Sequence, residues 1–99
     1  MKLPIRFRPG VATDLTAAAD WYDEERPGLG TEFAQAAYDA LGVIAERPES
    51  FPLVRPNARR ALMRRFPYAI YFRIEHDTVV VLVVVHTARS PSVWRKRLK

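Results

Sequence analysis

Cysteine is absent from this chain of 99 residues, which excludes disulfide bonds and thiolate chemistry. The chain also lacks a long apolar segment. Its longest apolar run, Val79 to Val85, has seven residues, far fewer than the ~20 needed to span a bilayer. No apolar run near the N-terminus indicates a signal peptide. We therefore expect a cytoplasmic protein without membrane association, folded as one domain over residues 1–99.

Acidic side chains are scarce in the second half of the chain. Residues 47–99 hold twelve basic and three acidic side chains, whereas residues 1–46 hold four basic and eight acidic ones. The net charges of the two parts are therefore +9 and −4, which together give the +5 of the whole chain. A basic half indicates a polyanion or an acidic protein surface as partner, or only a solvated surface that keeps the protein soluble.

The first half predicts one strand followed by two helices. Leu3, Ile5 and Phe7 alternate with other residues, as is typical of a short half-buried strand. Apolar residues at helical spacing then predict a first helix that opens at Thr13 or nearby Gly10 and stops at residues 26–28. A second helix is expected from about Gly30 to Glu46, with Thr31 as its cap, and the short link makes the two helices antiparallel neighbours.

Acidic residues crowd the end of the first helix, where their charge has the wrong sign for the helix dipole. We expect this end to be weakly stable or salt-bridged to the basic half. The residues concerned are Asp20, Asp23, Glu24 and Glu25.

The second half predicts strands. Residues 48–57 hold three prolines and are expected to form a loop. Strands are expected at residues 60–66, 68–74 and 78–86, with a turn of undetermined type at residues 75–77, and the apolar third strand should be covered on both faces. A short helical turn is expected from Ser92 to Arg97. The order β-α-α-β-β-β predicts an α+β fold, with the helical hairpin on one face of a mostly antiparallel sheet.

Several motifs, in this order and spacing, resemble the RelE/ParE superfamily of type II toxins over nearly the whole chain, and the details are more ParE-like than RelE-like. These motifs are Trp21–Tyr22, Arg26–Gly30, Phe66–Phe72, and His86 followed by Arg89, Pro91 and Trp94. The resemblance implies a toxin that a cognate antitoxin neutralises. ParE-like members act on DNA gyrase and block replication, RelE-like members cleave messenger RNA on the ribosome, and some relatives have no demonstrated target. A further alternative for this chain is a non-toxic relative that only binds its partner.

The residues of a nuclease are largely missing. RelE-like members use clustered lysine and arginine, often with a tyrosine near the C-terminus, but this chain has three lysines and its last tyrosine is Tyr71. Some relatives use a Glu–Arg–His set instead, which Glu49, Arg65 and His86 could imitate, with Arg89 nearby. The alternative for His86 is a hydrogen bond to a loop carbonyl at the end of a strand. The ParE-like function, inhibition of gyrase by protein binding, is therefore favoured over endoribonuclease activity.

Arginines on or beside the first strand of the second half are the main candidates for contact with a partner. Alternation places Arg60 and Arg64 on one face and Arg59 and Arg65 on the other. They would meet the carboxylates of antitoxin or target, or a phosphate backbone, or else only protect an edge strand from aggregation. The expected partner-binding residues are Arg59, Arg60, Arg64, Arg65, Tyr68, Arg89 and Trp94.

The remaining aromatic and basic residues are expected mainly to stabilise the fold. Trp21 and Tyr22 are expected in core and rim packing, and Arg89 and Trp94 as a cation–π pair that pins the C-terminus. The basic residues 95–99 form a tail that is either functional or disordered. No metal or cofactor site is expected, because two isolated histidines do not make a zinc set and residues 28–30 lack the strand context of a phosphate loop.

Overall fold

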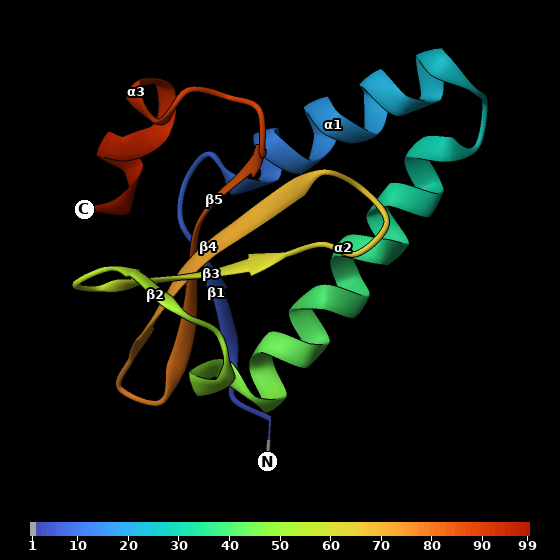
Figure 1. Ribbon diagram of the computed structural model, residues 1–99. Coiled ribbons are helices and arrows are strands. Elements are labelled where there is room, and N and C mark those ends of the chain that lie inside the picture. The colour runs from blue at the N-terminus through green and yellow to red at the C-terminus, as the bar shows by residue number, and fades with distance from the viewer. Residues whose placement is uncertain (1) are drawn as a thin grey trace.

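The computed structural model describes residues 2–99 and places a helical hairpin on one face of a five-stranded sheet. The helices are α1 (Val11–Glu25) and α2 (Leu29–Glu46), and they run antiparallel (Figure 1). Each helix begins after a glycine in the left-handed region, Gly10 at φ +97° and Gly28 at φ +91°. The cap of α2 is therefore Gly28, and the expectation of Thr31 was wrong because the left-handed turn at Gly28 starts the helix earlier, which places the cap three residues before Thr31.

The acidic end of α1 is stabilised by α2. The Asp23 carboxylate accepts hydrogen bonds from the backbone N–H groups of Gly28 (3.2 Å) and Gly30 (2.8 Å). These N–H groups lie at the start of α2, where the helix dipole favours negative charge. Asp23 thus caps the next helix. Within residues 2–99, no ion pair joins the basic half to Asp20, Asp23, Glu24 or Glu25.

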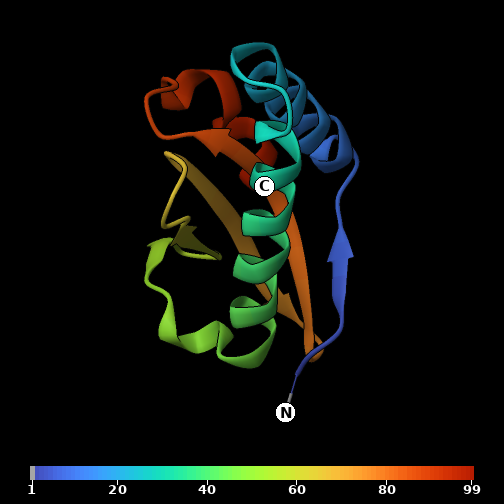
Figure 2. The ribbon, with the colours of Figure 1, turned by 90° about the vertical axis from the view of Figure 1, so that its right-hand side faces the viewer.

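The sheet has the order β1-β5-β4-β3-β2, with β1 parallel to β5 and the other neighbours antiparallel. The bounds of its strands are β1 Ile5–Phe7, β2 Leu53–Arg55, β3 Ala58–Leu62, β4 Tyr68–Glu75 and β5 Thr78–His86. Figure 2 shows β1 as a separate short strand along one side of the molecule. The fold class predicted from the sequence is confirmed.

Two of the expected strand assignments differ from the structure. The segment 48–57 was expected to be a loop, but it contains a 3-10 turn, η1 (Pro48–Ser50), and the edge strand β2. Pro52 and Pro56 flank this three-residue strand, a position that proline tolerates. Strand β3 begins and ends earlier than expected, so Arg64 and Arg65 lie in the loop after it.

Strand β5 is buried on both faces, as the sequence predicted. All residues from Val79 to Val85 are at most 8% exposed. On one face Val79, Val81 and Val84 join the core beneath the helices, and on the other Val80, Leu82, Val83 and Val85 pack under the C-terminal segment. The register shifts between Tyr71 and Phe72 of β4, which is why Leu82 and Val83 join the same core.

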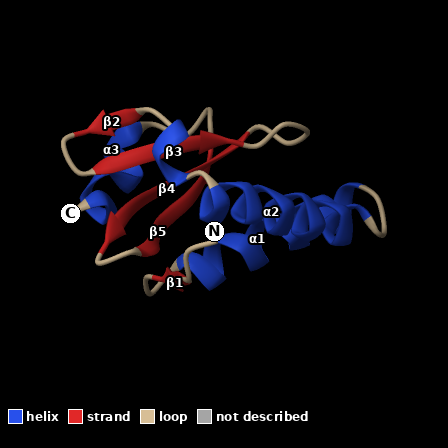
Figure 3. Cartoon of the chain, turned by 90° about the horizontal axis from the view of Figure 1, so that it is seen from below, coloured by secondary structure: helices blue, strands red, loops and turns tan. Residues whose placement is uncertain are grey.

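The C-terminal segment forms the third layer. It comprises α3 (Pro91–Trp94) and the 3-10 turn η2 (Arg95–Leu98), close to the expected helical turn. Seen from below, the helical hairpin and this segment lie on opposite sides of the sheet (Figure 3). Trp94 and Leu98 are buried against the sheet. In residues 2–99, no helix is both long and apolar enough to cross a membrane.

Candidate partner-binding site

An apolar groove runs between α2 and β3. Its volume is about 520 Å³. The side chains of Ala36 and Ala40 in α2 are small and leave this space open. Val43 of the helix and Leu62 of the strand border the space but do not fill it. Leu62 is 58% exposed and Val43 is 52% exposed, so the groove offers apolar surface to a partner. Its other lining residues are Asp39, Phe51, Ala61, Met63, Arg64 and Arg65.

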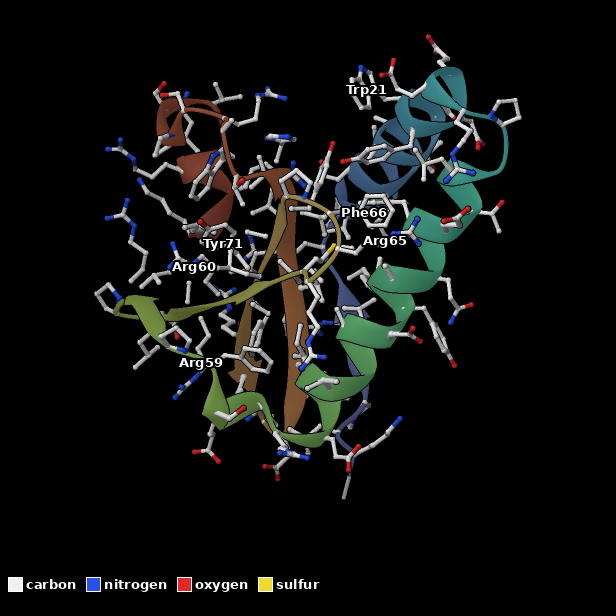
Figure 4. All side chains as sticks on the ribbon, turned by 45° about the vertical axis from the view of Figure 1, so that its right-hand side comes forward. Trp21, Arg59, Arg60, Arg65, Phe66 and Tyr71 are labelled. Carbon is white, nitrogen blue, oxygen red and sulfur yellow. The ribbon has the colours of Figure 1, made fainter. Side chains whose placement is uncertain are left out.

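Arginines form one end of this α2/β3 groove. Arg65 donates to the Glu32 carboxylate, and its guanidinium lies 5.1 Å from the centre of the Phe66 ring (Figure 4). Arg26 also reaches Glu32, at 3.3 Å. The hydrogen bond from Arg65 lowers the pKa of Glu32 most, and the charge of Arg26 adds to it. Arg64 makes no ion pair or side-chain hydrogen bond within residues 2–99, so its charge remains available.

The arginines of β3 face opposite sides of the sheet, as alternation predicted. Arg59 donates through Nη1 to the carbonyls of Phe51 (2.7 Å) and Glu49 (3.3 Å), which holds η1 against the sheet. Arg60 lies beside Tyr71 on the other face (Figure 4), and its buried Nε has no hydrogen-bond partner in the described residues. Neither lies on an edge strand, because β2 borders β3, so protection of an edge does not explain these charges.

A second hollow lies between α1, the end of β5 and the C-terminal segment. It has a volume of about 280 Å³, and Trp21, Tyr68, His86, Arg89 and Trp94 are among its lining residues. Trp21 is 55% exposed and forms part of its wall, whereas Tyr22 is buried in the core. Burial raises the pKa of Tyr68, Tyr22 adds to this rise, and the charge of Arg89 opposes it.

Two contacts in this α1/β5 hollow differ from expectation. His86 Nδ1 accepts a hydrogen bond from the Ala88 backbone N–H at 3.0 Å, so its partner is an amide and not a carbonyl. Trp94 Nε1 donates to the Arg89 carbonyl at 3.4 Å, and its ring lies 4.5 Å from that of Tyr71. The C-terminus is therefore pinned by stacking and a hydrogen bond, because the one cation–π contact within residues 2–99 is that of Arg65 with Phe66.

An ion pair that the sequence did not indicate closes one side of this hollow. Arg97 donates to both Asp14 oxygens, at 2.8 and 2.9 Å, and Asp14 Oδ2 also accepts from the Val84 backbone N–H at 3.0 Å. No partner was predicted for Asp14, and Arg97 was expected only in a short helical turn and a basic tail. Their separation of 83 residues explains why spacing could not pair them.

The structure does not bring together the candidate nuclease residues Glu49, Arg65 and His86. His86 and Arg89 share one hollow, but Glu49 lies near Arg59, whose neighbour in β4 is Phe72. Phe72 is four residues from Tyr68, the partner of His86, or about 13 Å along the strand. Arg65 lies on the far side of a ring cluster formed by Tyr22, Phe66 and Tyr68. Within residues 2–99, no group of His, Cys, Asp or Glu could hold a metal ion.

These features define a class: a small α+β domain with an exposed apolar groove bordered by arginines, in which Glu49, Arg65 and His86 do not lie together. Residues 5–91 match the sequence model of the family described as the ParE toxin of the type II toxin-antitoxin system parDE. The chain belongs to this ParE toxin family. A search among curated proteins gave no significant match.

Solved structures of toxins share the fold. A chain of the chromosomal ParDE system from P. aeruginosa is 18% identical, with a TM-score of 0.76 over 86% of this chain and 96% of its own. A mutant of the E. coli toxin RelE in the free state is 17% identical, with a TM-score of 0.68 over the full length of both chains. A chain of the RelBE2 toxin–antitoxin complex from Mycobacterium tuberculosis is 26% identical, with a TM-score of 0.57 over 87% of this chain and 99% of its own.

Proposed function

We propose that this chain acts in the cytoplasm as the toxin of a type II toxin–antitoxin pair and inhibits DNA gyrase by protein binding. A cognate antitoxin neutralises it by laying an acidic, amphipathic segment into the α2/β3 groove. The observation that carries the proposal is this exposed apolar groove with arginines at its end, in a member of the ParE toxin family. The dispersal of Glu49, Arg65 and His86 favours binding over RNA cleavage.

The chemistry of the groove selects the antitoxin segment. Apolar side chains at helical or strand spacing would cover Val43 and Leu62, as amphipathic segments do in other grooves. Carboxylates beside them would meet Arg64, which lacks a partner of its own within residues 2–99, and Arg65. A basic segment would instead meet like charges at this end of the groove, so the charge also sets specificity.

Replacement of Leu62 with aspartate tests this docking site. The Leu62→Asp variant should bind the antitoxin about 30-fold more weakly, because it removes a central apolar contact and brings a carboxylate into the covered groove. Isothermal titration calorimetry with the purified partner measures the loss. Leu62 is largely exposed in the chain without its partner, so the substitution should leave the fold itself stable.

Leu53→Asp is the matched control. Leu53 is 57% exposed, close to the 58% of Leu62, but it lies on β2 and does not line the groove. Its affinity for the antitoxin should stay within about twofold of the parent chain. Equal losses in the two variants, or full affinity of Leu62→Asp, would place the antitoxin elsewhere.

A further inference from the structure

Basic residues gather on the face of the sheet that the helical hairpin does not cover. Two hollows adjoin there, since both are lined by Arg95 and Lys99. Arg55 of β2 also lines one hollow, and Lys96 also lines the other. Arg60 of β3 is paired with Tyr71 of β4 and lies on the face of the sheet that Trp94 covers. We call this the C-terminal basic face; it consists of Arg55, Arg60, Arg95, Lys96 and Lys99.

The charges of the C-terminal basic face are not neutralised within residues 2–99. The cations that form ion pairs in this part of the chain are Arg6, Arg26, Arg65, Arg73 and Arg97, and none of them belongs to the C-terminal basic face. No acidic residue lines either hollow. The buried Nε of Arg60 lacks a hydrogen-bond partner, which is costly unless a ligand or solvent compensates it. Five cations without carboxylates beside them favour an anionic partner.

The C-terminal basic face is also held in place, which a disordered tail would not be. Leu98 is buried against the face of the sheet opposite the helical hairpin, the Trp94 ring packs against that of Tyr71, and Arg97 is fixed by Asp14. These contacts position Arg95, Lys96 and Lys99 between and beyond the anchored residues. Because these contacts hold the backbone of the segment, less backbone entropy is lost when its cations bind a partner, which favours a specific role.

The absence of exposed rings on this face distinguishes between polyanions. Proteins that bind single strands stack bases on aromatic side chains, but the exposed aromatic residues Phe7, Trp21 and Tyr38 lie on β1, α1 and α2. An acidic peptide needs apolar anchors to bind well, and none of the large apolar side chains that are exposed in residues 2–99 lines these hollows. Contacts to a duplex backbone require neither feature.

We propose that the C-terminal basic face binds the phosphate backbone of duplex DNA without reading its sequence. This face is on the other side of the sheet from the helices that border the α2/β3 groove (Figure 3). DNA and the antitoxin therefore occupy different surfaces of the chain. The inference goes beyond gyrase inhibition and does not depend on it.

Salt dependence of DNA binding tests the proposal. Fluorescence anisotropy of a labelled 20-base-pair duplex with the isolated chain gives Kd between 50 and 200 mM salt. If the four exposed cations each neutralise one phosphate, Kd should rise about 150-fold over this range. In the variant Arg95→Gln/Lys99→Gln, two contacts are lost and the rise should be only about 12-fold.

The control variant is Lys2→Gln/Arg47→Gln, which removes the same charge from exposed residues away from this face. Its salt dependence should match that of the parent chain. Equal changes in both variants would mean that overall charge alone attracts DNA, and would overturn the proposal. Absence of binding at 50 mM salt would do the same, as would tighter binding to duplex RNA or to poly-glutamate than to DNA. Thermal melts of both variants confirm that the fold is kept.

Discussion

Replacement of Gly30 with alanine should lower the free energy of unfolding by about 3 kcal/mol, because the added methyl group would force α1 and α2 apart. A Cβ atom at Gly30 would lie 2.3 Å from the backbone oxygen of Ala19 and 2.6 Å from the Asp23 carboxylate. A backbone oxygen cannot rotate away as a flexible side chain can. The same shift would strain the hydrogen bond by which Asp23 caps α2. Thermal or urea unfolding measures the loss.

Gly42 provides the matched control in the same helix. Among the described residues, a Cβ atom there would meet only Lys2 Nζ, at 3.6 Å, an ordinary contact. Alanine in a helix interior is favoured over glycine by about 0.5–1 kcal/mol, so Gly42→Ala should stabilise the chain slightly. The two variants should therefore move the midpoint in opposite directions. A Gly30→Ala variant as stable as Gly42→Ala would mean that the helices are not packed as closely as described.

Loss of the Asp14 carboxylate should destabilise the chain by about 3 kcal/mol, through two contacts at once. Within residues 2–99, strand β1 pairs with β5 at residues 79–81, so beyond Val81 β5 has no neighbouring strand on that side in this part of the chain. Asp14 replaces it by accepting the Val84 N–H, and it also holds Arg97. Asp14→Ala leaves both groups without their partner. Chemical denaturation measures the cost, and hydrogen exchange should rise most in residues 91–98.

Two further variants distinguish the contribution of the Val84 hydrogen bond from that of the Arg97 ion pair. Asp14→Asn keeps an oxygen for Val84 but removes the charge, so its cost should be smaller than that of Asp14→Ala. Arg26→Ala breaks an exposed ion pair with Glu32 and should cost less than 1 kcal/mol. If hydrogen exchange in residues 91–98 did not change in Asp14→Ala, the ion pair would not be what fastens the C-terminal segment.

The sequence predicted those parts of the fold in which the pattern of apolar residues matches the burial seen in the structure. Strand β5 was predicted with its observed bounds, because an unbroken apolar run needs cover on both faces. Strand β2 was missed, because three residues between prolines carry too little pattern. The hairpin turn at His76 and Asp77 uses left-handed backbone at φ 49° and 58° without the glycine or asparagine that usually marks such a turn, so its type was not predicted.

The candidate site was less predictable than the fold. The basic character of the second half was evident, but the pairing of Arg65 with Glu32 and of Arg97 with Asp14 joins distant residues. The same holds for the α2/β3 groove, since Val43 and Leu62 meet only once the hairpin lies on the sheet. The small side chains of Ala36 and Ala40 in α2 make room for the groove, and their spacing alone did not indicate this.

The most direct measurement of gyrase inhibition is a DNA cleavage assay with purified gyrase, supercoiled plasmid and this chain. The proposal predicts that the chain traps cleavage complexes, seen as linear plasmid after denaturation of gyrase, and that an equimolar antitoxin abolishes the linear product. Leu62→Asp should trap these complexes while resisting the antitoxin. Unchanged supercoiling and no linear product, together with codon-phased cuts in messenger RNA after induction, would contradict the proposal and establish the endoribonuclease instead.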